Sequence, residues 1–422
     1  MENDTDALSD FDAKSVAGLP LEKLDMSKPP LFRDDAWRPV FARLRREAPL
    51  HYLADSDNGP FWSATTHEMI LAVDANHEAF SSQAGGISII DAGADDQLSK
   101  AASIITLDEP EHARQRKTVS PAVGPTYLAE LEPLIRERAA DILDHLPVGE
   151  TFNWVDKVSV ELTARMLATL LDFPYERRRD LIRWSDVTTA QPGISEELDM
   201  DTRKAALREC AGVFFAMWKD RAAQAPKSDL ISMLAHGEAT RDLVSNPPLL
   251  LGNILLLIVG GNDTTRNSIS GGVLALNQHP EEYAKLRADP GLIPNMVSEV
   301  IRWQTPVIHM RRTALDDVEL GGKTIRKGDK VIMWYLSGNR DEAVFPDADR
   351  LIIDRPNARR HLAFGFGVHR CMGNRLAEMQ LRVLWEEIMK RFKMVEVVGD
   401  VERISNNFIR GIATLPVKVH PH

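Results

Sequence analysis

The sequence predicts a mainly α-helical protein with a small β part, and three features lead to this expectation. Helical spacing of apolar residues dominates residues 110–171 and 175–235. A third helical stretch, residues 246–278, is unusually long. Short apolar runs flanked by glycine predict a few strands elsewhere. We therefore expect helices to form the bulk of the fold.

The stretch 246–278 is expected to be a single helix. Asn246 can cap its start, Pro247 suits its first turn, and His279-Pro280 ends it. At about 1.5 Å per residue, this helix would be about 45–50 Å long. A helix of that length can cross a whole domain.

The remaining elements are expected to be short. A helix is expected near Asp35–Glu47, and the polar stretch Asp186–Leu198 is a candidate mobile lid over a pocket. The expected strands are Leu50–Leu53 paired with Gly59–Thr65, Val318–Ile325 folded at a Gly-Gly turn, Lys330–Tyr335, Val395–Val398 and Leu415–Val419.

Composition bounds the class of protein. The chain has 422 residues, is 44% hydrophobic and carries a net charge of −11, which disfavours a nucleic-acid partner. Without repeats or low-complexity tracts, we expect a loosely held arm over residues 1–30 and one domain over residues 31–422. The N-terminus lacks a secretory pattern, and the longest apolar run, Leu249–Gly261, is too short to span a bilayer. A soluble, cytoplasmic protein without a membrane anchor is expected.

The chain has only two cysteines, Cys210 and Cys371. Two thiols are too few for a disulfide scaffold or an iron–sulfur cluster. Cys210 stands at helical spacing from Leu207 and Phe214, so we expect it to lie in the core.

Cys371 lies in a different setting, the segment Phe-Gly-Phe-Gly-Val-His-Arg-Cys-Met-Gly of residues 364–373. A helix is expected from Asn374, and its N-terminus and the nearby cations favour a thiolate. The glycines let the backbone come close to a flat group. A lone thiolate with open space above it is one type of haem-iron ligand. The alternative, a core cysteine, gives no reason for the aromatic residues, glycines, His and Arg around one thiol.

The middle of the long helix contains the sequence Gly-Gly-Asn-Asp-Thr-Thr, residues 260–265. Each glycine costs a helix about 1 kcal/mol, and a buried carboxylate needs partners. An oxygen-activating site explains both features, because glycines make room for O2 and an acid–alcohol pair can relay protons. The alternative is a kinked core helix in which Asp263 and Thr264 satisfy each other.

These motifs resemble those of the cytochrome P-450 monooxygenases over roughly residues 35–420. Residues 364–373 fit the family pattern Phe-x-x-Gly-x-His/Arg-x-Cys-x-Gly, and residues 260–265 look like the family's distal helix. The resemblance implies the cytochrome P-450 fold, with a long central distal helix over haem b (iron protoporphyrin IX). It also implies a Cys-ligand loop before the proximal helix.

The resemblance assigns roles to particular residues. Cys371 would be the axial ligand of the haem iron, with Gly261 and Phe364 beside the cofactor, and Asp263 and Thr264 would be the catalytic acid and alcohol. The cations expected to bind the haem propionates are His112, Arg116, Arg312 and His369. The buried network expected to hold the proximal face consists of Glu299, Arg302 and Arg355. Any one of these charged residues alone would be better explained by a surface ion pair.

A narrower resemblance, carried by residues 305–314, 335–341 and 407–411, is to soluble bacterial alkane and fatty-acid terminal hydroxylases. It implies hydroxylation of the terminal carbon of alkanes or medium-chain fatty acids with O2. The expected walls of the substrate passage, each also compatible with ordinary core, are Ile104, Ile105, Leu256, Val259, Val307, Ile308 and Phe408. Three alternatives stay open: a same-family hydroxylase of a steroid side chain or terpene, a peroxide-using peroxygenase, and a non-catalytic haem-thiolate sensor or carrier. The acid–alcohol pair disfavours the last two.

The resemblance also implies separate electron carriers, because the chain offers no flavin or iron–sulfur module. These would be a ferredoxin and an NAD(P)H-dependent ferredoxin reductase. From Arg355 to Lys393 the sequence has nine Arg or Lys residues and three Glu residues. In an acidic protein, such a stretch predicts docking of an acidic partner. The alternative is a solvated helix face with some cations serving the propionates.

Overall fold

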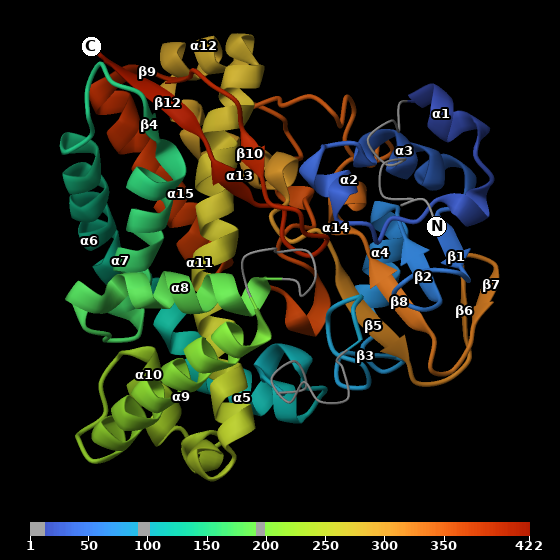
Figure 1. Cartoon of the computed structure of the whole chain (residues 1–422), viewed down its shortest axis with the longest axis horizontal. Coiled ribbons are helices and arrows are strands. Elements are labelled where there is room, and N and C mark those ends of the chain that lie inside the picture. The colour runs from blue at the N-terminus through green and yellow to red at the C-terminus, as the bar shows by residue number, and fades with distance from the viewer. Residues whose placement is uncertain (1–12, 92–101, 191–198) are drawn as a thin grey trace.

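The computed structural model describes residues 13–91, 102–190 and 199–422. One helix, α11 (Pro247–Gln278), runs through the helical part of the molecule (Figure 1). Asn246 caps it by accepting a hydrogen bond from the Leu249 N–H. The predicted long helix is thus confirmed, with the expected bounds and the expected cap.

Other helices pack around α11 and bury a large apolar core. α11 contacts α7 (Glu161–Leu170), α8 (Arg178–Thr189) and α13 (Ile293–Gln304), while α15 (Asn374–Arg391) lies against α6 (Pro125–Asp144). The remaining α-helices of the described residues are α1 (Ala13–Gly18), α2 (Pro30–Arg33), α3 (Trp37–Glu47), α4 (His67–Ala75), α5 (Glu111–Val119), α9 (Met200–Ala222), α10 (Leu230–His236), α12 (Pro280–Ala288) and α14 (Tyr335–Gly338). The mainly α fold class is confirmed.

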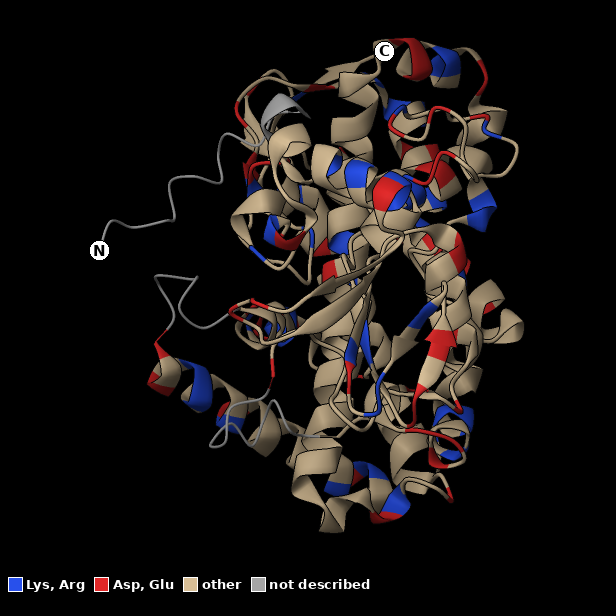
Figure 2. Cartoon of the chain, turned by 90° about the vertical axis from the view of Figure 1, so that its right-hand side faces the viewer, with Lys and Arg blue, Asp and Glu red and all other residues tan. Residues whose placement is uncertain are grey.

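The main sheet lies on the right in Figure 1 and faces the viewer in Figure 2. Its strand order is β1-β2-β8-β5-β3, with β2 and β8 parallel and the other neighbours antiparallel. Its strands are β1 (Leu50–Leu53), β2 (Phe61–Ala64), β3 (Phe80–Ser81), β5 (Met310–Ala314) and β8 (Lys330–Met333). The smaller sheets consist of β4 (Phe152–Asn153), β6 (Val318–Leu320), β7 (Lys323–Ile325), β9 (Phe392–Val397), β10 (Glu402–Arg403), β11 (Ile412–Thr414) and β12 (Pro416–Pro421).

Both predicted hairpins are confirmed, as β1–β2 and β6–β7. The second turns at Gly321 and Gly322, whose φ values of 55° and 72° favour glycine. The C-terminal strands are confirmed as the antiparallel pair β9–β12. The strand expected over residues 330–335 is shorter, because Tyr335 begins α14 and its hydroxyl donates to the buried Asp74.

Two expectations about flexible segments are wrong in part. Within residues 16–30, Val16, Leu24 and Met26 are buried in an apolar cluster with α3, whereas residues 1–12 lie outside the described residues. The first residues of the expected lid, 186–189, form the last turn of α8 instead. Hydroxyls of this turn donate to carbonyls four residues earlier and so continue the helical pattern. Residues 191–198 of that stretch lie outside the described residues.

A fully buried carboxylate, Glu299 on α13, holds two guanidinium groups. Arg302 Nε lies 2.7 Å from Glu299 Oε2, and Arg355 Nε lies 3.0 Å from Oε1. All three side chains are shielded from water. Removing one partner would therefore leave an uncompensated charge in the core.

The same cluster holds the backbone of residues 339–355, which lead toward the Cys371 loop. Arg302 donates to the carbonyls of Asn339 (2.7 Å) and Ala348 (2.8 Å). The Ile352 N–H donates to Glu299 over 2.9 Å. These bonds fix the segment to α13.

Glu299→Gln is expected to lower the free energy of unfolding by about 3–5 kcal/mol, because two buried guanidiniums lose their anion. Urea denaturation of the purified, cofactor-loaded protein measures this change. Asp317→Asn is the matched control, since Asp317 pairs with Arg326 at the surface, where ion pairs contribute little. Equal urea midpoints for the Glu299 variant and the wild type would contradict the structural role.

Candidate active site

Cys371 lies at the end of a tight loop directly before α15. Its N–H donates to the Phe364 carbonyl over 2.8 Å and closes the loop. Gly367 has a φ of 65°, and a Cβ at this position would collide with the carbonyl oxygen of Asp74. The loop therefore requires glycine there for its close approach to α4.

A buried carboxylate that the sequence did not single out anchors this loop. Asp74, near the end of α4, accepts hydrogen bonds from the Phe366 N–H (2.8 Å), the Tyr335 hydroxyl (2.9 Å) and Arg312 Nη2 (2.8 Å). Burial raises the pKa of Asp74, and the three donors oppose that rise. Asp74 thus ties the loop to β5 and α14. Its signal in the sequence is weak, a single acid at the end of an apolar helix.

Cys371 has solvent-accessible surface, and many protein atoms nevertheless lie near its thiol. Burial raises the pKa of the thiol, while the N–H groups of Gly373 and Asn374 and the guanidiniums of Arg116 and Arg370 act in the opposite direction. The helix N-terminus and the cations expected from the sequence are present, but burial outweighs them in the free thiol. A bound metal ion deprotonates a thiol ligand outright, so the raised pKa of the free thiol is compatible with a role as metal ligand.

Three predicted propionate partners lie together beside the loop. His112 and His369 have ring centroids 4.2 Å apart, and Arg116 donates to the Arg370 carbonyl. Burial, followed by the charge of Arg312, lowers the pKa of His369 to about 3. His112 and Arg116 line a cavity of about 370 Å³.

These side chains have unused polar atoms. His112 Nδ1 is 2.8 Å from Glu109, but its buried Nε2 has no partner among the described residues. His369 Nε2 is 3.1 Å from the Ser82 hydroxyl, and its Nδ1 is likewise unpartnered in that part of the chain. Such buried polar atoms need a partner, and a carboxylate of a bound group would supply it.

The fourth predicted partner, Arg312, differs from the other three. It is buried, and its Nη2 is paired with Asp74 at 2.8 Å. Its charge is therefore already balanced by a protein carboxylate. The sequence could not show this pairing, because Asp74 and Arg312 lie far apart along the chain.

On α11, the predicted acid and alcohol face different partners. The Thr264 hydroxyl donates to the Gly260 carbonyl over 3.0 Å. Asp263 is fully buried, and its Oδ1 accepts from Asn262 Nδ2 (2.9 Å) and pairs with Arg266 Nη2 (2.8 Å). The idea that Asp263 and Thr264 satisfy each other in a kinked helix therefore does not hold, and α11 is helical throughout this region.

The two glycines of α11 also differ. A Cβ on Gly261 would lie 2.9 Å from Leu167 Cδ1, so this glycine permits close packing of α11 on α7. A Cβ on Gly260 would meet nothing within 4 Å. Open space beside α11 is thus found at Gly260, whereas the role predicted for Gly261 beside the cofactor stays a prediction.

The expected passage walls fall into two groups. Ile308 is fully buried in a cluster with Trp37, Phe41 and Trp334, and Ile104 is buried in the main core. These two are core residues in the structure, because their side chains are enclosed by other apolar side chains. The partly exposed members, which can still line a passage, are Ile105, Leu256, Val259, Val307 and Phe408.

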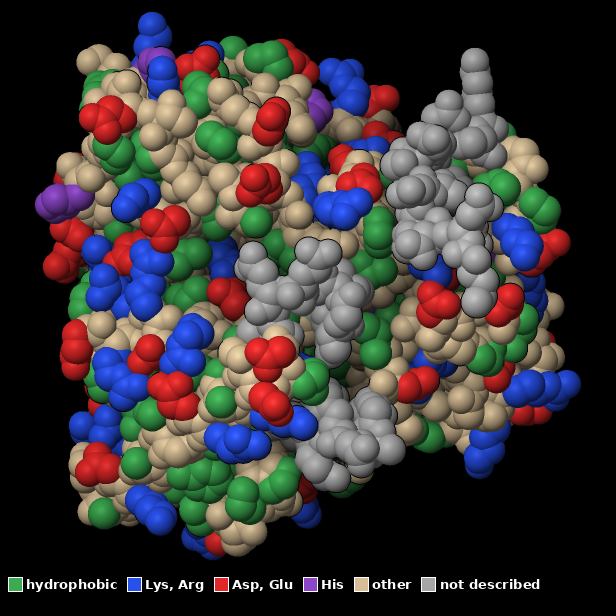
Figure 3. Space-filling model, in the orientation of Figure 1, with side chains coloured by type: hydrophobic (Ala, Val, Ile, Leu, Met, Phe, Trp, Pro, Cys, Tyr) green, Lys and Arg blue, Asp and Glu red, His purple; other side chains and the backbone are tan. Residues whose placement is uncertain are grey.

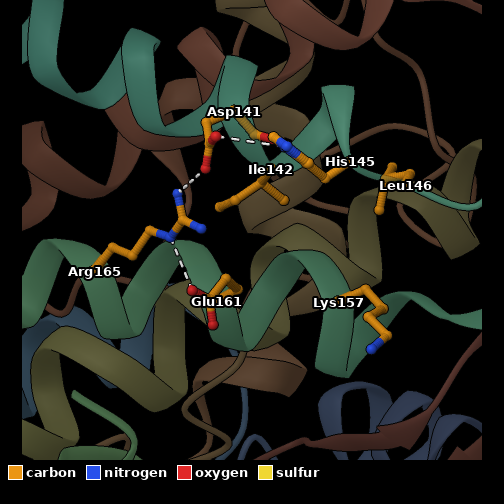
Figure 4. Close-up of a pocket in the computed structure, with 7 residues that line it drawn as sticks. All are labelled: Asp141, Ile142, His145, Leu146, Lys157, Glu161 and Arg165. Atoms are coloured by element: carbon orange, nitrogen blue, oxygen red, sulfur yellow. Dashed lines mark hydrogen bonds and ion pairs between the residues drawn. The ribbon is translucent and has the colours of Figure 1, made fainter. Parts of the chain in front are cut away.

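A separate surface cavity of about 340 Å³ lies between α6 and the start of α7 (Figure 4). Arg165 crosses it and pairs with Asp141 and Glu161. It is lined by Asp141, Ile142, His145, Leu146, Lys157, Glu161 and Arg165. None of the predicted site residues belongs to it.

On the face drawn in Figure 3, acidic and basic side chains are interspersed.

The residues present fit haem. The accessible thiol of Cys371 would be the ligand of the iron, the unpartnered nitrogens of His112 and His369 would face the propionates, and Gly260 leaves space at α11. Together with the fold, this site defines a haem-thiolate enzyme.

Comparison with known proteins gives the family. The Cytochrome P-450 family model matches residues 291–420. Linalool 8-monooxygenase of Pseudomonas putida is 36% identical over 95% of this chain and 100% of its own length. Methyl-branched lipid omega-hydroxylase of Mycobacterium tuberculosis is 32% identical over 95% of both chains. The structure of cytochrome P-450-153 from Novosphingobium aromaticivorans is 46% identical, with a TM-score of 0.88 over 94% of this chain and 99% of that one.

The chain belongs to the cytochrome P-450 family. It is a monooxygenase, and its cofactor is haem. Among the described residues, no helix combines the length and apolar content needed to cross a membrane.

Cys371→Ser is expected to abolish the red-shifted Soret band of the reduced carbonyl complex, because an alcohol cannot replace a thiolate ligand. Absorption spectra of the two proteins measure this directly. Cys210→Ser is the matched control, since Cys210 is buried in the core and should leave the band in place. A Cys371 variant that kept the band would exclude this thiol as the ligand.

Proposed function

We propose that this monooxygenase hydroxylates the terminal carbon of alkanes or medium-chain fatty acids, with O2 and with electrons from a ferredoxin. The observation that carries the proposal is that residues 305–309 and 406–411, which we call the substrate wall, bond to each other and carry the partly exposed side chains of Val307 and Phe408. A terminal C–H bond is stronger than its methylene neighbours, so terminal attack requires that only the end carbon reach the reacting position. A wall that holds its shape meets this requirement.

Backbone bonds join the two segments of this wall. The Ile308 N–H donates to the Phe408 carbonyl (2.9 Å), and the Arg410 N–H donates to the Pro306 carbonyl (2.8 Å). Val307 and Ile409 form an antiparallel bridge. The side chains of Val307 and Phe408 are thereby held in fixed positions.

Side chains reinforce the wall. His309 Nδ1 donates to the Asn407 carbonyl (2.8 Å), and its Nε2 accepts from the Ile89 N–H (3.1 Å). Burial lowers the pKa of His309 to about 4, so the ring stays neutral at physiological pH. Arg410 donates to the Gln304 carbonyl at the end of α13 (2.9 Å). These bonds favour one fixed geometry for the passage.

Haem, when bound, activates O2 for insertion into a C–H bond. In the proposed mechanism, Asp263 is the buried carboxyl that holds a proton for this chemistry. Burial raises the pKa of Asp263, with Arg266 opposing the rise, so the protonated form is favoured relative to an exposed carboxyl. The half-buried Thr264 hydroxyl would position that proton. This pair disfavours a peroxygenase or a sensor, neither of which needs proton delivery.

A second candidate substrate class is a terpene or steroid side chain. It is favoured by the similarity to the relative named for linalool. The similarity to cytochrome P-450-153 and to the omega-hydroxylase favours the terminal assignment instead. Products from a panel of alkanes, fatty acids, terpenes and sterols distinguish the two.

Val307→Ala and Phe408→Ala are expected to raise the share of sub-terminal alcohol, because a wider passage admits the inner methylenes. Gas chromatography of the products gives the ratio of terminal to sub-terminal alcohol. Ile135→Val is the control, because Ile135 is buried on α6 away from this wall, so its truncation should cost about 0.5–1.5 kcal/mol of stability and leave this ratio unchanged. A wild type that makes mainly internal alcohols, or accepts only sterols, would overturn the terminal assignment.

Ferredoxin docking would use the exposed cations near the Cys371 loop. Arg359, Arg360, Arg370 and Arg375 are exposed. Arg382 lies in the same basic stretch, but it pairs with Glu132 (2.7 Å) and Glu386 (2.8 Å). Its charge is compensated, so it is a weaker candidate than the sequence alone indicated.

Arg375→Glu is expected to slow reduction by an acidic ferredoxin several-fold at low ionic strength. The difference should shrink as salt approaches about 0.15 M, because screening shortens the range of the attraction. Stopped-flow reduction measures both effects. Arg382→Ala, the matched control, should change the rate less. Identical kinetics of the Arg375 variant and the wild type at low salt would place docking elsewhere.

A further inference from the structure

The Arg266 guanidinium on α11 lies between two carboxylates. Its Nη2 is 2.8 Å from Asp263 Oδ1, and its Nη1 is 2.9 Å from Asp186 Oδ1. The exposed fractions of the side chains rise from 1% at Asp263 to 8% at Arg266 and 52% at Asp186. A chain of charges thus runs from the buried acid to the protein surface.

Asp186 belongs to the last turn of α8, and this turn lies against Asp263. Ser185 and Thr189 of the turn favour the charged form of Asp263, but Asp263 Oδ2 has no hydrogen-bond partner among the described residues. Asn406 donates to the Thr189 carbonyl over 3.0 Å and holds the end of the turn. The end of α8, which carries Asp186, is therefore held against α11 on one side and by Asn406 on the other.

Charges of opposite effect act on Asp263 from these elements. Burial raises the pKa of Asp263, Arg266 lowers it and Asp186 raises it. From α7, the facing group is neutral, because Thr163 donates to Asn262, which in turn donates to Asp263. Arg266 and Asp186 are thus the charges that set the balance.

We infer that Asp186 is a positioning residue for proton delivery: by sharing Arg266 with Asp263, it keeps the buried acid in the form that can give a proton. This inference rests on the proposed role of Asp263 as the proton-holding group. The Arg266 guanidinium remains charged and passes no proton itself. Asp186 acts only by pairing with Arg266, which weakens the attraction between Arg266 and Asp263.

The inference predicts shifts of opposite sign in two variants. In Asp186→Asn, Arg266 serves Asp263 alone, so the pKa of Asp263 falls and the proton is lost at a lower pH. In Arg266→Gln, Asp263 loses its cation, so its pKa rises and the proton is kept to a higher pH. If Asp186, Arg266 and Asp263 had a merely structural role, both variants would lower stability, and the pKa of Asp263 would not shift in opposite directions.

The experiment measures product formed per electron consumed as a function of pH, in the holoenzyme with a saturating fatty acid. The pH at which this yield falls by half should move down by about half a unit or more in Asp186→Asn and up in Arg266→Gln. Infrared difference spectra, with Asp263→Asn as the blank, report the same shifts directly at the Asp263 carboxyl. Asp180→Asn removes one charge from the same helix, but Asp180 pairs with Arg177 and Arg183, so its profile should match the wild type.

The outcomes separate this inference from the proposed function. An unchanged midpoint in Asp186→Asn, with or without weaker substrate binding in a spin-state titration, would overturn the inference. If Asp263→Asn alone had wild-type yield at every pH, the proposed role of Asp263 would fail as well. Support requires that Asp263→Asn lower the yield and that adding Asp186→Asn to it cause no further change.

Discussion

The structure depends on one buried carboxylate, Glu299, which neutralises two guanidiniums in the core. A charge pair removed from water is stable only when each partner's remaining donors are also satisfied. Arg302 and Arg355 meet this condition by binding carbonyls of residues 346–350. The pairing therefore fixes the chain that leads into the Cys371 loop, and α13, which carries Glu299, continues directly into residues 305–309 of the proposed substrate wall. One ionic cluster thus positions both faces of the site.

A buried carboxylate paired with a guanidinium also occurs at Asp74 and at Asp263, with different consequences. Asp74 pairs with Arg312 and also holds the Phe366 N–H, so it connects the sheet to the Cys371 loop. Asp263 pairs with Arg266, but its Oδ2 is left without a partner in the described residues. Burial raises the pKa of both acids, but three donors hold Asp74 in place, whereas Oδ2 of Asp263 can exchange a proton. The difference between Asp74 and Asp263 lies in the number of donors that face each carboxylate.

The sequence was sufficient where the controlling interaction is local. The bounds of α11 follow from Asn246, Pro247 and Pro280, and the β6–β7 hairpin follows from its Gly-Gly turn. The Cys371 loop could also be predicted, because the positive φ values of Gly365 and Gly367 are a local requirement, to which the contact of Gly367 with Asp74 adds a distant one. The burial of Val16, Leu24 and Met26 cannot be predicted in this way, since these apolar residues are spaced too widely to form a local pattern.

The sequence does not predict ion pairs between residues that are far apart along the chain, and these pairs set the charges of the site. Asp74 and Arg312 are separated by 238 positions, and Asp186 and Arg266 by 80. No local pattern marks either pair, so the sequence alone predicts a propionate partner at Arg312 and a lid at Asp186 but neither of the two ion pairs. Gly260 and Gly261 are a further example of what the sequence cannot show. Leu167, which is distant in the sequence, packs against Gly261 and leaves open space only beside Gly260. Family motifs identify the reacting groups, but the partners that set their charge come from the packing of distant helices.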